Sequence, residues 1–441
     1  MVVGELKRAL DRPVDLASLA VFRILFGVLM TVASVRFLAR GWVATEWLTP
    51  RFFFSYVSFI RPLPGDGMYA VYVVCAACAV LVAVGFLYRP AIIVFATLFS
   101  YAHLCDVTNY LNHYYLVSLL ALLMCFLPLD REYSLRVRLR PEDRRASVHA
   151  WALWLLRFQV AVVYVFGGLA KLGPDWLLRG EPLHIWLVGD GHLPLLSHIA
   201  RAHWLALAFS WCGLLFDLSI VPLLLWSRSR PWAYAVVVAF HLMTSALFPI
   251  GMFPWIMSAA ATLFFAPAWP RRWAPHRAEP RGTVATRPLG GWLWVVGVYA
   301  IVQLVVPLRH LAYPGNTLWT EEGFRWSWRV MLIDKVGDLE LEVVDAHDHR
   351  FDISPSEYLT PTQRYQASTQ PDLILAFAHL VADDFVRRGR GPVRVYAHTA
   401  VTWNGRRHAP IVDPTVDLVR LHDGLLPKPW ILPAPTTEPR W

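Results

Sequence analysis

Charged residues are scarce in this sequence. They make up 17% of its 441 residues, whereas hydrophobic residues make up 56%, and the mean hydropathy is +0.42. Because about a quarter of an average soluble protein is charged, this composition excludes an ordinary soluble domain and predicts a helical protein with several membrane spans. The net charge of +9 would fit a nucleic-acid partner. However, the arginines form short clusters between apolar runs, which is typical of cytoplasmic loops, so we expect no nucleic-acid binding.

Cysteine is also scarce, and the last third of the chain has none. The five cysteines lie in or at the edges of apolar segments: Cys75, Cys78, Cys105, Cys125 and Cys212. The sequence therefore needs no disulfide framework, and no Cys/His cluster has the spacing of a zinc site. Cys75-Ala-Ala-Cys78 has the spacing of a redox motif, but we interpret it as two small apolar side chains in a membrane helix.

Histidine and aspartate offer only weak metal candidates. His103 and Asp106 would share one helical face, whereas His113 belongs to the next element. The stretch His347-Asp348-His349 is typical of a polar hairpin turn. We therefore expect no metal cofactor.

Lysine is the rarer cation by far: lysine and arginine total 41, and only four are lysines. One of them, Lys171, follows an apolar run long enough to cross a membrane. A guanidinium stays protonated at any workable pH, whereas a desolvated ammonium can lose its proton and act as a base. Lys171 is therefore a candidate catalytic base. The alternative is that its side chain merely extends to the outer headgroups.

Long apolar runs dominate the first 310 residues. A membrane span needs about 20 mainly apolar residues. Nine runs approach that length: 17–39, 69–87, 90–108, 113–129, 150–170, 203–226, 231–247, 250–267 and 290–308. The first is long enough to span and lacks a clear cleavage site, so we interpret it as a span rather than a signal peptide. The sequence predicts an α-helical polytopic membrane bundle of about nine spans.

The loops between these runs differ in charge. If the N-terminus is cytoplasmic, the loops on that side carry most of the arginines, six of them between 131 and 145. The loops on the opposite side carry far fewer. The positive-inside rule then places the N-terminus in the cytoplasm and, after an odd number of spans, the C-terminal region outside.

The sequence pattern changes after about residue 310. Segments 340–344 and 393–398 alternate polar and apolar residues, as strands with one buried face do, and 371–387 has apolar residues at helical spacing. We therefore expect a transmembrane domain at 1–310, followed by a mostly β extracytoplasmic domain with at least one helix at 311–441.

Candidate site residues collect in the loops predicted on the outer side. They are Asp106, Asn112 and His113 between the third and fourth spans, Lys171 after the fifth, His241 at the end of the seventh, and Met252, Phe253 and Trp255 after it. Aromatic walls with a few polar groups suit a flat apolar ligand with ionisable oxygens. Plainer interpretations are a helix cap for Asn112 and a hydrogen-bonded interfacial residue for His241.

Several motifs resemble those of one family, in the same order along the chain. They are the runs Phe166 to Trp176 and His241 to Trp255, together with Phe216-Asp217-Leu218-Ser219, Ala266-Pro267, Trp326-Ser327-Trp328, Val401-Thr402-Trp403-Asn404 and Asp413-Pro414. They resemble the vitamin K-dependent gamma-glutamyl carboxylase family, whose membrane part is the horizontally transferred transmembrane domain. The similarity extends from about residue 16 to about residue 425.

The resemblance implies an enzyme that couples oxidation of reduced vitamin K by O2 to carboxylation of peptidyl glutamate with CO2. In that family a lysine deprotonates the hydroquinone, O2 adds, and the ring collapses to an epoxide through an alkoxide that removes a γ-hydrogen from glutamate. Lys171 matches that lysine, and Asn112 and His113 match the family's Asn-His pair. A quinone reductase is then an expected partner. The arginine, alanine and tryptophan usage suggests a GC-rich bacterium, hence the inner membrane and menaquinol as the quinol.

Two other functions stay open. A quinol oxygenase or epoxidase without the carboxylation step would need the same base and pocket. A non-enzymatic transporter or scaffold would need polar residues along a path through all the spans, whereas the candidate residues lie on one side.

Overall fold

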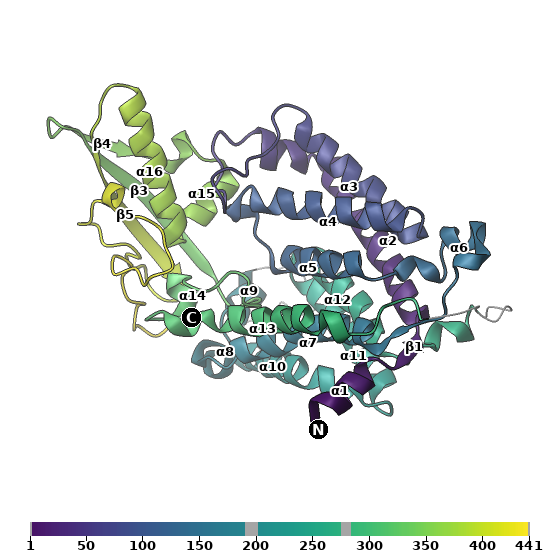
Figure 1. Cartoon of the computed structure of the whole chain (residues 1–441). Helices are drawn as coiled ribbons and strands as arrows, with labels where there is room; N and C mark the ends of the chain where they lie inside the picture. Colours follow the sequence, from purple (N-terminus) through teal and green to yellow (C-terminus); the bar gives the residue numbers. More distant parts are fainter. Residues whose placement is uncertain (1, 190–201, 275–283, 440–441) are drawn as a thin grey trace.

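The computed structural model describes residues 2–189, 202–274 and 284–439. It is a bundle of helices with a smaller domain at one end (Figure 1). The bundle helices are α2 (Ala17–Ala39), α3 (Gly67–Val84), α4 (Tyr88–Leu104), α5 (Asn112–Phe126), α7 (Ala150–Ala170), α10 (His203–Leu225), α11 (Arg230–Leu247), α12 (Phe253–Ala261) and α13 (Leu293–Leu308). Shorter elements around them are α1 (Val2–Leu10), β1 (Pro13–Asp15), α6 (Leu135–Leu139), β2 (Ser147–His149), α8 (Pro174–Arg179) and α9 (Leu183–Gly189).

Each of the nine predicted spans coincides with one bundle helix, but only some of these helices are individually identified as spans by their length and apolarity. Five described helices combine the length and apolarity of a span: α2, α3, α7, α10 and the helix that begins with α13. By contrast, α5 has 15 residues and α12 has 9. The described helices therefore make this a membrane protein with five candidate spans, and the count of nine is not established by them.

The bundle helices pack in two groups. In the first, α2 contacts α3, α3 contacts α4, and α4 contacts α5, and this group is purple to blue in Figure 1. In the second, α10 contacts both α7 and α11, and α13 lies against α7. Helix α12 contacts α2, α5 and α7, so it joins the groups around one continuous apolar core. Antiparallel pairing of β1 with β2 ties the start of α2 to the start of α7.

A buried arginine holds the first group together. Arg23 on α2 is 0% exposed. Its guanidinium donates to the carbonyl oxygens of Val82 at 2.7 Å and Ala83 at 2.9 Å, and to that of Tyr133 at 2.6 Å. The last carbonyls of a helix have no partner within it. Arg23 therefore supplies donors to the end of α3 from a neighbouring helix.

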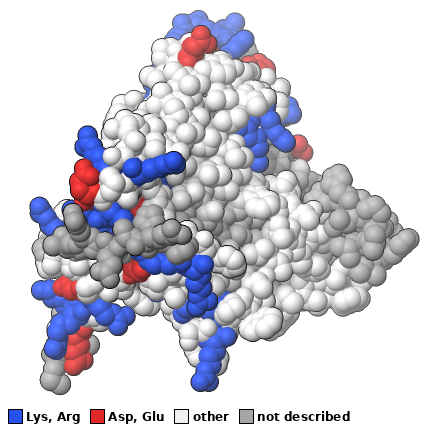
Figure 2. All heavy atoms as spheres, turned by 90° about the vertical axis from the view of Figure 1, so that its right-hand side faces the viewer, with Lys and Arg blue, Asp and Glu red and all other residues white. Residues whose placement is uncertain are grey.

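The end of the bundle farthest from the smaller domain is rich in cations. Figure 2 looks at that end, and Lys and Arg are more abundant there than Asp and Glu. Several of these arginines form ion pairs, as Arg271 does with Asp15 at 2.6 Å and Arg136 with Asp143 at 2.8 Å. The cationic loops therefore gather at one end of the molecule, and the smaller domain lies at the other.

The smaller domain, which we call the tail domain, contains α14 (Thr317–Thr320), β3 (Lys335–Val344), β4 (Arg350–Ile353), α15 (Pro361–Ala367), α16 (Pro371–Arg387) and β5 (Arg394–Trp403). Its antiparallel sheet has the order β4-β3-β5. Alternate residues of β3, such as Leu341 and Val343, are buried together with Phe377 and Val381 from α16. The predicted strand and helix segments are thus all present.

The expectation of a mostly β tail domain is wrong. The strands have 10, 4 and 10 residues, whereas α16 alone has 17. The alternating pattern identified the strands, but a sheet of three strands has an apolar face that must be covered. Helix α16 covers it, and the result is a mixed domain with a small sheet and helices.

We predict that Arg23→Met destabilises the bundle. The substitution keeps an apolar stem but removes the buried guanidinium that donates to Val82, Ala83 and Tyr133, so the free energy of unfolding should fall by at least about 2 kcal/mol. Denaturant titration of the purified protein in detergent measures it. Arg40→Met, at the exposed end of the same helix, should change it by less than about 0.5 kcal/mol. Equal effects of the two substitutions would contradict the role given to Arg23.

Candidate active site

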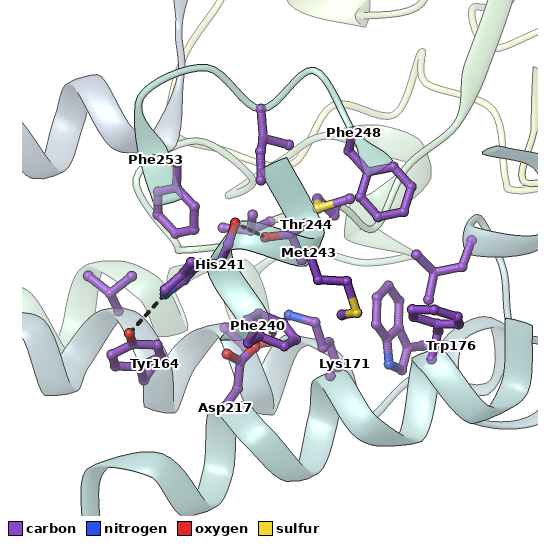
Figure 3. Close-up of a pocket in the computed structure, with 18 residues that line it drawn as sticks. Tyr164, Lys171, Trp176, Asp217, Phe240, His241, Met243, Thr244, Phe248 and Phe253 are labelled. Carbon is purple, nitrogen blue, oxygen red and sulfur yellow. Dashed lines mark hydrogen bonds and ion pairs between the residues drawn. The ribbon is translucent and has the colours of Figure 1, made fainter. Parts of the chain in front are cut away.

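A mainly apolar cavity lies near the tail-domain end of the bundle. We call it the Lys171 cavity. Its walls come from α7, α10 and α11, from the loop after α11, and from Val330 and Met331 of the tail domain. Five phenylalanine and tryptophan side chains line it: Trp176, Phe209, Phe240, Phe248 and Phe253. The polar groups, Lys171, Asp217, Tyr164, His241 and Thr244, face the same space, and Figure 3 shows their arrangement.

Lys171 is nearly buried and has a specific partner. It is 7% exposed and follows the last residue of α7. Its Nζ lies 2.7 Å from Oδ2 of Asp217 and donates to the carbonyl oxygen of Gly167 at 3.2 Å. The indole of Trp176 lies beneath the ammonium, with 5.2 Å from Nζ to the ring centroid. These contacts hold the amine of the lysine at the wall of the cavity.

Two glycines on α7 allow this ion pair to form. A Cβ at Gly168 would lie 2.6 Å from a methyl carbon of Leu218 and 3.2 Å from Cβ of Asp217, and one at Gly167 would lie 3.4 Å from Oδ2 of Asp217. Only residues without a side chain let α10 approach α7 so closely. The Gly-Gly pair of the sequence motif is therefore a helix contact that brings a carboxylate to the lysine.

Asp217 was missing from the predicted site residues. A signal for it was present, because Asp217 is the single Asp, Glu, Lys or Arg in the apolar run 203–226. An ionisable residue inside a span is usually functional and usually paired. What the sequence did not contain is the identity of the partner, since Lys171 is 46 positions away and belongs to another helix.

His241 lies on the opposite side of the same cavity. The hydroxyl of Tyr164 is 3.1 Å from Nε2 of His241. Thr244 donates to the carbonyl oxygen of His241 at 3.1 Å. Of the five residues predicted to form a quinol pocket, His241 and Phe253 line the cavity.

The other three predicted pocket residues are not among those that line it. Trp255 is 45% exposed, and Met252 is buried at 6% exposure. Asp106 instead joins the two domains, because its Oδ2 accepts a hydrogen bond from Nε2 of Gln363 at 3.0 Å while Oδ1 accepts from Thr108. Burial raises the pKa of Asp106, and the bonds from Thr108 and Gln363 partly offset that rise.

His113 and Asn112 border the site without lining the Lys171 cavity. Phe253 lies between the two histidines, with ring centroids 6.4 Å from His113 and 6.1 Å from His241. Nδ2 of Asn112 donates to the carbonyl oxygen of Arg329 at 3.1 Å. Arg329 directly precedes the two tail-domain residues that line the cavity, so Asn112 anchors that part of its wall.

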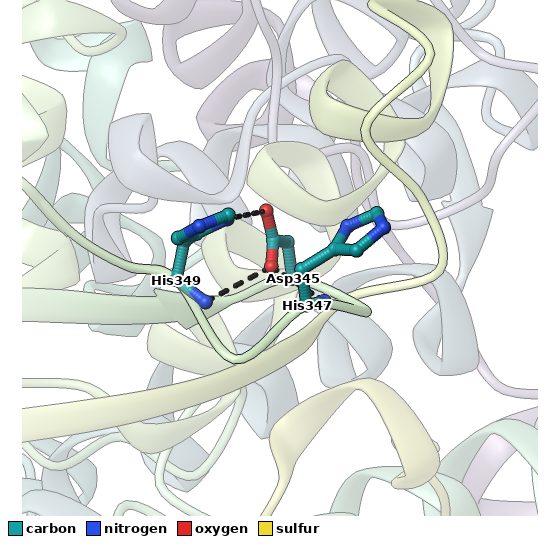
Figure 4. A group of neighbouring side chains, drawn as sticks. All are labelled: Asp345, His347 and His349. Carbon is teal, nitrogen blue, oxygen red and sulfur yellow. Dashed lines mark hydrogen bonds and ion pairs between the residues drawn. The ribbon is translucent and has the colours of Figure 1, made fainter.

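The stretch around His347 forms the turn between β3 and β4, as its sequence predicts. Asp345, His347 and His349 have possible ligand atoms within 4.8 Å of one another (Figure 4). However, Oδ1 of Asp345 accepts the backbone N–H groups of His347 and His349, and Oδ2 lies 3.1 Å from Nδ1 of His349. The carboxylate is thus already used to close the turn.

Two family models match the chain. Residues 11–269, more than half of the sequence, match the HTTM domain. Residues 291–437 match the lumenal domain of vitamin K-dependent gamma-carboxylase. No solved structure matches the chain.

We predict that Lys171 and Asp217 are energetically coupled. Asp217→Asn leaves a buried ammonium without its carboxylate, and Lys171→Met leaves the carboxylate alone, so each should destabilise the protein by about 3 kcal/mol. The double variant leaves no charge, so its loss of stability should be smaller than the sum of the two single losses by at least about 2 kcal/mol. Unfolding in detergent measures all three, and Ser219→Ala, on an exposed position of α10, serves as control. Additive losses would contradict the pairing.

Proposed function

The chain belongs to the vitamin K-dependent gamma-carboxylase family, and we propose that it couples oxidation of a reduced quinone by O2 to carboxylation of glutamate side chains with CO2. The observation that supports this most directly is the Lys171–Asp217 pair on the wall of an apolar, aromatic cavity. A base in such a place can act on a weakly acidic hydroxyl while water is excluded.

The cavity has the chemistry that a naphthoquinol requires. Aromatic side chains such as Phe240, Phe248 and Trp176 provide flat apolar walls, and the polar groups are grouped rather than scattered. Reduced vitamin K or menaquinol would supply the reducing equivalents and, with O2, the strong base that the carboxylation needs. We propose no metal in this site.

Lys171 is proposed as the base that removes the hydroxyl proton. We propose that the carboxylate of Asp217, whose Oδ2 is 2.7 Å from Nζ, can take a proton from the ammonium. When that proton is on Asp217, the amine is neutral and able to accept another from a bound hydroxyl. When it is on Lys171, the pair is charged and the site is at rest. The pair thus provides the neutral amine without releasing a proton into an apolar region.

His113 and Asn112 are proposed to act indirectly, through residues that line the Lys171 cavity. His113 reaches the site only through Phe253, and Asn112 through the wall segment that begins at Arg329. We therefore assign them to positioning the oxidation step rather than to the first proton transfer. His241, with Tyr164 as its partner, remains a proposed contact of the quinol ring.

The finer topology is also a proposal. We propose nine spans within residues 1–310, a cytoplasmic N-terminus, an extracytoplasmic tail domain at 311–441, and a location in the inner membrane of a bacterium. The cation-rich end of the bundle lies away from the tail domain (Figures 1 and 2), which supports it. A glutamate-containing peptide or protein and a quinone reductase are the proposed partners, besides membrane lipid.

Carboxylation of a co-substrate peptide tests the function. Purified protein in lipid nanodiscs should convert reduced quinone to its epoxide and fix labelled CO2 into a glutamyl peptide, with both products dependent on O2. Lys171→Arg should keep the ion pair but lose more than nine tenths of both activities, a barrier increase of more than about 1.4 kcal/mol, because arginine does not give up its proton. Lys428→Arg, a lysine of the tail domain, should remain active.

The two products are followed separately because they distinguish the alternatives. Epoxide without labelled peptide would identify a quinol oxygenase and exclude the carboxylase. Neither product from the wild-type protein would exclude both enzymes and favour a transporter or scaffold. Activity of Lys171→Arg above a tenth of wild type would remove Lys171 from the role of base.

Reporter fusions test the topology. Fusions after residue 140 and after residue 228 should report the cytoplasm, because both positions lie in arginine-rich loops. A fusion after residue 430 should report the exterior. If that last fusion reports the cytoplasm, the number of spans is even and the proposed topology is wrong.

A further inference from the structure

A second cavity adjoins the first at the junction of bundle and tail domain. We call it the Arg329 cavity. Trp176 lines both cavities. The segment 329–332 runs between them: Val330 and Met331 line the first cavity, whereas Arg329 and Leu332 line the second. The two spaces are therefore separated by a single layer of side chains. A molecule held in the second could present one atom to the first.

The Arg329 cavity contains a cation with no counter-ion. Arg329 has no ion pair with any residue that the structure describes, and its Nε is buried without an acceptor. Burial, together with the nearby guanidinium of Arg309, lowers the pKa of Arg329 to about 10. Arg309 donates to the backbone oxygens of Val306 and Arg325 and offers no negative charge. This wall of the cavity therefore attracts an anion.

A buried carboxyl group faces the same cavity. Glu181 is 1% exposed and has no ion pair among the described residues, and the backbone N–H of Ile185 is the one donor near its carboxyl group. Burial is the main cause that raises the pKa of Glu181 to about 8. At neutral pH the group is thus mainly a neutral acid that can donate one hydrogen bond. Buried polar groups with so few partners are costly unless a ligand satisfies them.

The other acid and base of this cavity are already paired. Arg406 donates to Asp175 at 2.6 Å and 2.9 Å, and Asn404 donates to the same carboxylate at 3.1 Å. These groups hold the tail domain against α8 and are satisfied without a ligand. Among the described residues that line this cavity, Arg329 and Glu181 are the charged or acidic groups without an ion pair.

We infer that the Arg329 cavity binds a peptide through the carboxylate of an acidic side chain, with Arg329 as its counter-ion and Glu181 as a hydrogen-bond donor to it. Leu318, Leu332 and Trp403 provide apolar surface for the rest of the peptide. The inference rests on the proposed function, because the methylene next to the held carboxylate would be the carbon presented past Trp176. A small free carboxylate or bicarbonate carries the same kind of negative charge and would bind the same groups. Competition with bicarbonate distinguishes such an anion from a peptide.

Direct peptide binding tests the inference without turnover. A fluorescent peptide with one glutamate, and a matched peptide with glutamine, are titrated with the full-length protein in nanodiscs, in the absence of quinone. The wild-type protein should bind the glutamate peptide at least 10-fold more tightly, about 1.4 kcal/mol. Arg329→Gln should abolish that preference, and Arg329→Lys should keep part of it. Arg407→Gln removes the same charge from an exposed neighbour of Arg406 and should change nothing.

Glu181→Gln tests the hydrogen-bond donor of the proposed site independently of its cation, Arg329. The charged or titratable groups around Glu181 are Asp175, Asp334 and Arg406, with His310 and Arg329 in the same cavity. As the pH rises from 7 to 9, Glu181 ionises and should repel the peptide, so wild-type affinity should fall several-fold. Glu181→Gln should bind normally at pH 7 and show no such fall.

Three results would overturn the inference. They are unchanged affinity in Arg329→Gln, equal binding of the two peptides to the wild-type protein, and complete displacement of the glutamate peptide by millimolar bicarbonate, which would assign the cavity to a small anion. Failure of the proposed function is a different result. A glutamate preference that depends on Arg329 in a protein that fixes no CO2 would support the binding site and reject the carboxylase.

Discussion

The close contact between α7 and α10 is the constraint on which the site depends. It buries an ammonium and a carboxylate in an apolar region, where either charge alone would be strongly unfavourable. Gly167 and Gly168 permit the approach, and the Lys171–Asp217 pair makes one register of the two helices preferable to others. The same pair is the proposed proton acceptor. The interaction that stabilises the helix pair is therefore also the one proposed to carry the chemistry.

The tail domain completes the site that the bundle begins. The segment from Trp326 to Met331 contains three residues other than glycine with positive φ: Trp326 at 60°, Trp328 at 58° and Met331 at 58°. Such conformations are unfavourable and persist where surrounding contacts impose them. Trp328 is 0% exposed and stacks on Tyr115 at 4.9 Å, and Asn112 holds the next carbonyl. Bundle contacts thus force this segment into the shape that separates the two cavities.

Because of that arrangement, we propose a different ligand for each of the two cavities. The Lys171 cavity is mostly aromatic and suits an apolar ring, whereas the Arg329 cavity contains a free cation and a buried acid and suits an acidic peptide. A membrane-soluble reductant and a water-soluble peptide could then meet across one layer of side chains without sharing a space. Trp176, which contacts Lys171 and lines both cavities, is the central residue of that layer.

The sequence by itself determined the membrane class, the positions of the helices, the strand segments of the tail domain and Lys171 as the unusual cation, because these follow from local composition and periodicity. It did not determine which groups meet. Asp217 reaches Lys171 from another helix, Phe253 separates His113 from His241, and Arg329 lies unpaired beside Glu181 only because the tail domain folds onto the bundle. Pairing, burial and cavity walls depend on contacts between residues far apart in the chain, so only the tertiary structure decided them.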